Sequence, residues 1–199
     1  MSAPVFTLEY DREHDSDRRT STADAVTASD IQAESFGSLE FRRTLGRFAT
    51  GVTVVTMLAH DGTASWSGDD APERAFGITV NAFMSVSLEP ALIAISIDKS
   101  AHAHATLLAA KRFGVSVLSE DQRDLSDYFA GRRVHLGLNP FVQVAGFPVI
   151  AEAGAQLVCR TYNAVEAGDH TIFLGEVVAL RHHDARPLVF HAGRYDQLG

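Results

Sequence analysis

Seven short segments rich in β-branched and other apolar residues follow one another along the chain, and only short helical segments separate them. Most are bounded by Gly, Pro, Asn, Asp or Ser, as is typical of strands joined by turns. They span residues 51–57, 75–82, 91–97, 113–118, 155–165, 171–180 and 187–191. Regular alternation of strands with longer helices, which would indicate a parallel sheet, is missing. We therefore predict a mostly β fold with short helices, a largely antiparallel barrel or sandwich.

Three short helices are expected beside these strands. Apolar residues at helical spacing predict an amphipathic helix near residues 41–49. A second helix is expected to begin with Ser100 as its N-cap. A third is expected to begin at Ser119, where Gln122 completes a capping box. The polar residues 60–74 are expected to form an exposed excursion between strands.

Acidic residues are concentrated near the N-terminus. Residues 1–35 hold eight acidic and three basic residues, so they carry −5 of the formal net charge of −8. They offer few apolar anchors, and we expect a flexible acidic arm followed by one domain over residues 36–199. The overall acidity disfavours a nucleic-acid binder. No apolar run is long enough to span a membrane and no secretory signal is visible, so a cytoplasmic protein is expected.

Several common catalytic and nucleotide-binding motifs do not occur in the sequence. There is no Gly-x-Gly-x-x-Gly, no Gly-Lys-Ser/Thr phosphate loop, no His-Glu-x-x-His and no Gly-x-Ser-x-Gly. The single cysteine, Cys159, lies in a strand-like run, and we interpret it as a buried hydrophobic residue rather than a nucleophile. His182 and His183 lie at the end of an expected strand, where neighbouring side chains face opposite sides, which disfavours a metal site.

Residues 76–90 carry more polar groups than a buried strand would. Thr79, Asn81 and Ser85 lie close to Gly77 in this segment. Small hydroxyl and amide groups beside a glycine suit a backbone that approaches the edge of a planar, polar ligand. A strand with one polar, solvent-facing side explains the same pattern equally well.

Residues 96–102 lie at an expected junction between a strand and a helix. If Ser100 is the N-cap, the free N–H groups of the first helical turn face the same place as Lys99, one of only two lysines. A helix N-terminus beside a cation and hydroxyl groups favours a phosphate. Simple helix capping with a surface lysine is the alternative.

Residues 166–175 contain a predicted hairpin. Gly168 and Asp169 separate two strand-like runs, which is typical of a two-residue turn. His170 follows the turn directly, where we expect its imidazole to be accessible. It is therefore a candidate functional residue, although an ordinary turn histidine would give the same pattern.

In this order, the segments resemble the flavin reductase-like family, which includes the short-chain NAD(P)H:flavin reductases of two-component monooxygenases. The resemblance covers about residues 41–195. It rests on Phe41-Arg42 through Thr50-Gly51-Val52-Thr53-Val54-Val55-Thr56, and on Gly77-Ile78-Thr79-Val80-Asn81-Ala82-Phe83, Ser85-Val86-Ser87-Leu88-Glu89-Pro90, Phe113-Gly114-Val115-Ser116-Val117-Leu118, Asp127-Tyr128-Phe129-Ala130, Gly168-Asp169-His170 and Gly193-Arg194-Tyr195. It implies the FMN-binding split β-barrel fold, of Greek-key type, and a homodimer.

The resemblance also implies where ligands bind. The isoalloxazine ring of FMN or FAD would be lined by Thr50, Thr79, Val80, Asn81 and Ala82. Its ribityl and phosphate end would be held by Ser96, Asp98, Lys99 and Ser100. NADH or NADPH would lie near Gly168, Asp169 and His170, with Phe129 and Tyr195 as further neighbours. His170 is the candidate catalytic residue, and no metal is implied.

The implied activity is flavin reduction by NAD(P)H, with a hydride passing from nicotinamide C4 to flavin N5. Reduced flavin would be supplied to a partner monooxygenase on another chain, and no nucleic-acid or membrane partner is implied. A protein that holds flavin without turnover, as a store or an interaction module, is the main alternative. A flavin-dependent oxidase or reductase of an organic substrate is a third possibility.

Overall fold

The computed structural model describes residues 35–58 and 75–198. The acidic arm expected over residues 1–35 lies, except for Ser35, outside the described residues, and so does the excursion expected over residues 60–74. The chain divides into two units, Met1–Gly37 and Ser38–Gly199, and the helices and strands given below belong to the second unit. None of the helices described is long and apolar enough to cross a membrane.

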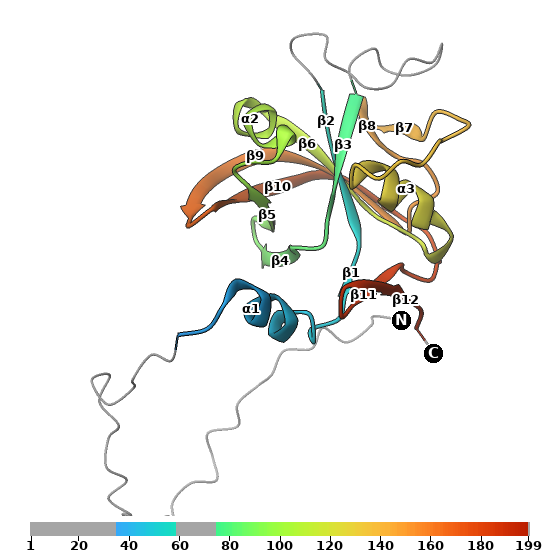
Figure 1. Cartoon of the computed structure of the whole chain (residues 1–199). Helices are drawn as coiled ribbons and strands as arrows, with labels where there is room; N and C mark the ends of the chain where they lie inside the picture. Colours follow the sequence, from blue (N-terminus) through green and yellow to red (C-terminus); the bar gives the residue numbers. More distant parts are fainter. Residues whose placement is uncertain (1–34, 59–74, 199) are drawn as a thin grey trace, which may run out of the picture. The chain divides into compact units, whose positions relative to one another are not determined.

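Short helices and many strands make up the second unit (Figure 1). The α-helices are α1 (Ser38–Leu45), α2 (His102–Ala109) and α3 (Arg123–Phe129), and a 3₁₀ turn at Glu120–Gln122 leads into α3. The strands are β1 (Thr50–Gly51), β2 (Thr53–Leu58), β3 (Ala75–Val80), β4 (Phe83–Leu88), β5 (Ala91–Asp98), β6 (Arg112–Val117), β7 (Phe141–Val144), β8 (Phe147–Ile150), β9 (Ala155–Ala167), β10 (His170–His182), β11 (Val189–His191) and β12 (Arg194–Asp196).

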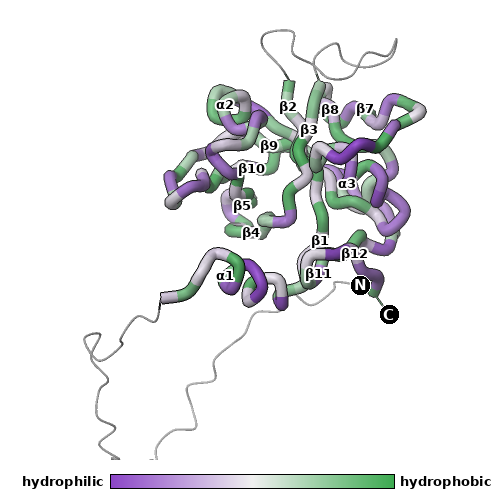
Figure 2. Tube along the Cα trace, viewed as in Figure 1, coloured by the Kyte–Doolittle hydropathy of each residue, from purple (hydrophilic) through white to green (hydrophobic). Residues whose placement is uncertain are grey.

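Seven strands form one sheet in the order β3-β2-β6-β9-β10-β5-β4. Strands β1, β11 and β12 form a second sheet, and β7 and β8 form a hairpin. All of these strand pairs are antiparallel. Strand β2, largely hydrophobic in Figure 2, is buried on both faces because Val54, Val55 and Met57 are all fully buried. The predicted mostly β, antiparallel architecture with short helices is therefore confirmed.

Strands β3 and β4 lie at opposite edges of the seven-stranded sheet, yet they are consecutive in the chain (Figure 1). Only Asn81 and Ala82 separate them, so the Cα atoms of Val80 and Phe83 are at most about 11 Å apart. In a flat sheet of seven strands, the two edges would lie roughly 29 Å apart. The sheet must therefore roll until its edges approach each other. We call Asn81 and Ala82 the seam.

A long hairpin, β9 and β10, joins the two halves of this sheet. β9 pairs with β6, β10 pairs with β5, and the two strands pair with each other over their whole lengths. Gly168 adopts a positive φ of 64°, which a glycine tolerates without steric cost. Together with Asp169 it forms the two-residue connection between the strands, so the predicted hairpin is confirmed.

The main core lies within the rolled sheet. Phe113 of β6, Phe173 of β10 and Leu107 of α2 are all fully buried and belong to one hydrophobic cluster. Gly175 lies directly beside Phe113, because a Cβ atom at this position would be 2.4 Å from Cζ of Phe113. A glycine is therefore needed here for the aromatic ring to fit.

Some element boundaries differ from the predictions. The strand predicted over residues 75–82 ends at Val80, because the chain leaves the sheet edge at the seam. β4 was not predicted. It is an edge strand whose side chains are mostly exposed, so its sequence need not alternate between apolar and polar residues. The short strands β7, β8 and β12 were also missed. The first helix spans Ser38–Leu45 instead of residues 41–49, because the chain turns at Gly46.

The predicted N-cap of the second helix is wrong. Helix α2 begins at His102 with Ala101 at its N-cap, and the N-cap makes no side-chain hydrogen bond. The Ser100 hydroxyl is already bonded to the carboxylate of Asp98, so it is used in a turn that precedes the helix. By contrast, the capping box predicted at Ser119 is confirmed.

Candidate functional site

The turn that follows β5 is closed by the side chain of Asp98. Its Oδ1 accepts hydrogen bonds from the backbone amide of Ser100 at 2.7 Å and from the Ser100 hydroxyl at 2.8 Å. These bonds stabilise the carboxylate and lower the pKa of Asp98, and the charges of His170 and Arg42 act in the same direction. The turn is therefore preformed around an ionised carboxylate. Lys99 lies between Asp98 and Ser100, the two residues that these hydrogen bonds join.

Lys99 connects this turn to the β9–β10 hairpin. Its amide donates to the carbonyl of Asp169 at 2.9 Å, and its Nζ lies 3.5 Å from Oε2 of Glu166. The side chains of Lys99 and Glu166 are 37% and 85% exposed, so solvent screens this long ion pair strongly. An anionic ligand can replace such a counter-ion, and Lys99 is therefore suited to receive a phosphate.

His170 begins β10 opposite Asp98 of β5. Its Nδ1 lies 2.7 Å from Oδ1 of Asp169, and this hydrogen bond is the main reason that the pKa of Asp169 is lowered. The imidazole is about 41% exposed, and Nε2 has no hydrogen-bond partner among the residues that the structure describes. Asp169 thus orients the ring and leaves Nε2 available to a ligand.

These residues meet at one place, residues 98–100 and 166–170, which we call the β5–β10 corner. The structure brings together here six of the predicted site residues: Asp98, Lys99, Ser100, Gly168, Asp169 and His170. The phosphate-binding and nucleotide-binding segments were inferred from separate stretches of sequence. Their meeting at one corner is what a site for two neighbouring ligands requires.

The seam lies further along the same strand, β5. Ser96 and Asp98 alternate with buried Ile95 and Ile97, so they share the outward face of β5 and lie about 7 Å apart. The Ser96 amide donates to the carbonyl of Ala82 at 3.0 Å, which fixes the seam to β5. Of the predicted ring-binding residues here, Asn81 and Ala82 are exposed and Val80 is buried. A ligand that reaches from the seam to the β5–β10 corner would follow this face of β5.

The two threonines predicted at the ring differ in their hydrogen bonds. The Thr79 hydroxyl donates to the carbonyl of Ser126 at 2.7 Å, so its proton is already used. Thr50 lies on β1 opposite Phe190, and its buried Oγ1 has no hydrogen-bond partner among the described residues. Because buried hydroxyl groups normally have a partner, a polar ligand atom would fit Thr50.

Phe129 lies in the hydrophobic core. Its ring is 8% exposed, and its centroid lies 5.9 Å from that of Phe141. It also packs against Gly77 of β3, where an added Cβ would be 3.0 Å from the ring. A ring enclosed in this way offers little surface for stacking, so we leave Phe129 out of the site.

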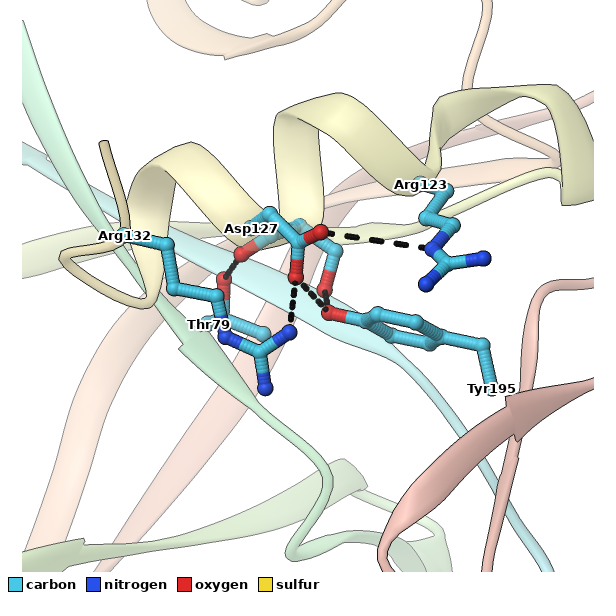
Figure 3. A network of polar contacts seen from close by, with 6 residues as sticks. Thr79, Arg123, Asp127, Arg132 and Tyr195 are labelled. Atoms are coloured by element: carbon cyan, nitrogen blue, oxygen red, sulfur yellow. Dashed lines mark hydrogen bonds and ion pairs between the residues drawn. The ribbon is translucent and has the colours of Figure 1, made fainter. Parts of the chain in front are cut away.

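Tyr195, also predicted beside the nucleotide, belongs to a polar network around Asp127 of α3 (Figure 3). The Tyr195 hydroxyl donates to Oδ1 of Asp127 at 2.9 Å and lies 2.8 Å from Oγ of Ser126. Asp127 also pairs with Arg132 at 2.7 Å and with Arg123 at 4.0 Å. Both of the known partners of the Tyr195 hydroxyl are therefore on α3.

Burial and the neighbouring carboxylate raise the pKa of Tyr195. Burial is the larger cause, and the hydrogen bond to Asp127 and its negative charge act in the same direction. The guanidinium groups of Arg123 and Arg132 lie 5.1 Å and 5.9 Å from the centre of the Tyr195 ring. Tyr195 is thus held as a neutral phenol against α3.

Sequence reasoning missed several residues of these clusters. Glu166, the counter-ion of Lys99, lies in the segment that was singled out but had no role there. Asp127 belongs to the motif Asp127-Tyr128-Phe129-Ala130 but was given no role. Ser126 and Arg132 are part of no motif recognised in the sequence. Arg42, whose charge lowers the pKa of Asp98, was expected on the polar face of a helix and in a family motif, but without a role in the site. Contacts such as Lys99–Glu166 and Asp127–Tyr195 join residues that are more than 60 positions apart, so they leave no local pattern in the sequence.

The remaining candidates lie elsewhere. Cys159 is fully buried, and burial raises the pKa of its thiol to about 12, so its interpretation as a hydrophobic residue is confirmed. His182 is the last residue of β10, and His183 follows it. Among the residues that the structure describes, no three His, Cys, Asp or Glu side chains are grouped so that they could hold a metal ion.

The fold and the site define a class of protein. Residues 45–199 match the model of the flavin reductase like domain, and the chain belongs to this family. The family expected from the ordered motifs is therefore confirmed.

Several well-matched relatives make the relationship more specific. An NADH-dependent flavin reductase from Rhodococcus sp is 37% identical over 172 residues, which cover 86% of this chain and 92% of the relative. The FMN reductase (NADH) SmoA of Agrobacterium fabrum is 41% identical over 159 residues, covering 79% of this chain and 84% of the relative.

Solved structures agree with this assignment. Flavin reductase PheA2 in its native state superimposes with a TM-score of 0.72 at 39% identity, covering 82% of this chain and 99% of PheA2. The NADH:FAD oxidoreductase SgcE6 of Streptomyces globisporus C-1027, in complex with NAD and FAD fragments, has a TM-score of 0.69 at 35% identity. That match covers 81% of this chain and 92% of SgcE6.

Proposed function

We propose that this protein is an NAD(P)H:flavin oxidoreductase that reduces FMN or FAD and supplies the reduced flavin to a monooxygenase. The observation that carries the proposal is the β5–β10 corner. There the amide of Lys99, in the turn after β5, is hydrogen-bonded to Asp169, and His170 lies opposite Asp98. The relatives from Rhodococcus sp and Agrobacterium fabrum, named as NADH-dependent reductases of flavin, support it. A reductase rather than a flavin store is thus the function that we favour.

The flavin is proposed to lie along the outward face of β5. Its ring would lie at the seam, beside Thr50, Val80, Asn81 and Ala82, and the unpartnered Oγ1 of Thr50 supports this placement. Its phosphate end would lie beside Ser96, Asp98, Lys99 and Ser100. When bound, the flavin supplies the redox chemistry, because its ring accepts a hydride from reduced nicotinamide.

His170 is proposed to orient the nicotinamide nucleotide. Asp169 fixes the imidazole through Nδ1, so Nε2 can hydrogen-bond to the carboxamide or ribose of the nucleotide. Hydride transfer needs no general base, so the role assigned to His170 is orientation rather than proton transfer. Gly168 allows the tight turn that presents this histidine at the end of β10.

A crossed steady-state assay tests the proposal. Purified protein is mixed with NADH or NADPH and with FMN, FAD or riboflavin, and the loss of reduced nicotinamide is followed. We expect oxidation that depends on added flavin. A protein that oxidises neither nucleotide with any flavin would contradict the proposal, and one that stays yellow after gel filtration without turnover would favour a flavin store.

We further propose that the rolled sheet is a split barrel and that the protein is a homodimer. Large apolar side chains are exposed on β4, with Met84 at 60% and Leu88 at 85%, and in the turn after α1, with Phe48 at 77%. β4 pairs only with β5, so its outer edge is open within the described part of the chain. A second copy could cover such surfaces. Light scattering after gel filtration should give twice the chain mass of 21.5 kDa, and a monomer at micromolar concentration would contradict the dimer.

The proposed recipient of reduced flavin is an oxygenase on another chain. A relative from Rhodococcus opacus, 34% identical over 161 residues, is the reductase component of a 4-nitrophenol 4-monooxygenase/4-nitrocatechol 2-monooxygenase. Reduced flavin made by this protein should sustain turnover of a flavin-dependent oxygenase added in trans. Oxygenase turnover no greater than without the reductase would contradict this role. A cytoplasmic location stays a prediction.

A further inference from the structure

Helix α3 contacts strand β3 at two matched positions. Gly77 and Thr79 share one face of β3, because alternate residues of a strand point the same way. Ser126 and Phe129 share one face of α3, because they are three residues apart. Phe129 packs on Gly77, and the carbonyl of Ser126 accepts a hydrogen bond from the Thr79 hydroxyl at 2.7 Å. The end of β3 is therefore fixed to α3 immediately before the seam.

Ser126 connects this contact to Tyr195. Ser126 is fully buried, and its carbonyl accepts both the Thr79 hydroxyl and the amide of Ala130, the latter at 3.0 Å. Its own hydroxyl lies 2.8 Å from the hydroxyl of Tyr195. One buried residue thus has its backbone bonded to β3 and its side chain bonded to β12.

Tyr195 is itself held on several sides (Figure 3). Its hydroxyl donates to Asp127, whose carboxylate is only 14% exposed and is paired with Arg132 at 2.7 Å. Its ring makes an edge contact with Phe190, with centroids 5.6 Å apart. Hydrogen bonds to a charged, partly buried acceptor are stronger than neutral ones, so this tyrosine is a firm anchor for Ser126.

We propose that Tyr195 and Asp127 are positioning residues for the flavin ring and do not contact the nucleotide. They act through Ser126 and Thr79, which hold the end of β3 so that the seam keeps the form that receives the ring. The chain of contacts is Asp127–Tyr195–Ser126–Thr79, and Thr79 is two residues from Asn81. This role rests on the flavin reductase activity proposed above and replaces the expected contact of Tyr195 with the nucleotide.

The first test compares Tyr195→Phe with Tyr162→Phe in full-length protein. Tyr162 lies on β9 and is 56% exposed, so it serves as the matched control. Loss of one hydrogen bond in the chain should raise the KM for flavin about fivefold. The KM for NADH and kcat should stay within about twofold of the wild type. A rise in the KM for NADH instead would show that Tyr195 contacts the nucleotide and would overturn the proposal.

Hydrogen exchange tests the coupling without any ligand. In flavin-free protein, Tyr195→Phe should increase the exchange of the amides in residues 76–83 several-fold, whereas Tyr162→Phe should leave them unchanged. Unchanged exchange in Tyr195→Phe would overturn the proposal. This measurement does not depend on turnover. If the wild-type protein proved inactive, the proposed function would be contradicted, but hydrogen exchange would still decide whether Tyr195 holds the end of β3.

A double-mutant comparison decides whether the residues act in series. Thr79→Val removes only the hydroxyl that binds Ser126 and should also raise the KM for flavin. If the contacts form one chain, the double variant Thr79→Val/Tyr195→Phe should be little worse than either single variant. Effects that multiply would overturn the proposal. If Tyr195→Phe does not fold, Asp127→Asn takes its place in each comparison.

Discussion

The backbone amide of Lys99 donates a hydrogen bond to the carbonyl of Asp169 at 2.9 Å. This bond joins the turn after β5 to the turn between β9 and β10, which are 70 residues apart in the chain. Two candidate ligand-binding segments become one surface through it.

Replacing Lys99 should selectively weaken the binding of flavins that carry a phosphate. Lys99→Ala should raise the dissociation constant of FMN about tenfold, since a charge-assisted hydrogen bond to phosphate is lost. Riboflavin, which has no phosphate, should bind almost as before. Fluorescence titration with both flavins measures the difference, and Lys111→Ala, the other lysine, is the control. Equal losses for FMN and riboflavin would refute the phosphate role.

Replacing the counter-ion should have the opposite effect. Glu166→Gln removes the carboxylate 3.5 Å from the Lys99 ammonium, so FMN should bind about twofold to threefold more tightly. Riboflavin binding should not change, and the gain should vanish when Lys99 is also replaced by Ala. A gain that survives in the double variant would mean that Glu166 does not compete for Lys99.

His170→Ala should affect the nucleotide and spare the flavin. We expect the KM for NADH to rise about fivefold, because one orienting hydrogen bond is lost, with little change in flavin affinity. His182→Ala at the other end of β10 is the matched control. Steady-state kinetics with NADH varied at saturating flavin measures the effect. Unaltered nucleotide kinetics would make His170 an ordinary turn residue.

The carboxyl of Asp98 should titrate below its ordinary pKa of 3.8. Its lowered pKa means that the folded protein binds this proton more weakly than the unfolded chain. Its stabilising contribution is therefore present above about pH 4 and is lost as the pH falls through the lowered value. Side-chain NMR titration follows it directly. Ser100→Ala removes one of the two donors and should raise the pKa of Asp98, and no change would contradict the assigned cause.

Gly175→Ala should destabilise the core. The added Cβ would lie 2.4 Å from Phe113 and 2.9 Å from Cβ of Cys159, so the strands or the ring must shift. We expect a loss of about 1–3 kcal/mol in the free energy of unfolding, measured with denaturant. Gly137→Ala is the control, because a Cβ there would meet nothing within 4 Å. Equal stability of the two variants would contradict the packing argument.

The parts of the fold that were predicted carry local signals. The β9–β10 hairpin followed from two strand-like runs around Gly168 and Asp169, and the capping box from the spacing of Ser119 and Gln122. β4 gave no such signal, because it is an exposed edge strand with serines between its apolar residues. The Ser100 N-cap failed because Asp98, two residues earlier, takes the same hydroxyl.

The site was predicted less completely than the fold. Residues contiguous in the sequence, such as 98–100 and 168–170, could be grouped from motifs, and the structure places them together. The Asp127–Tyr195 bond joins residues 68 positions apart, and no pattern in either segment indicates it. Tertiary contacts decide whether a threonine hydroxyl has a hydrogen-bond partner. Thr79 has one, and Thr50 has none among the described residues.

The β9–β10 hairpin also determines when the chain can fold during synthesis. Before residues 155–182 leave the ribosome, β3, β2 and β6 can pair among themselves, and so can β4 and β5, but no strand pairs with both groups and only the seam connects them. The seven-stranded sheet is completed only when β9 and β10 insert between these two groups. Until then, the buried faces of both groups stay open to water and to other chains. A truncation within β10 should therefore yield aggregated protein rather than a smaller domain.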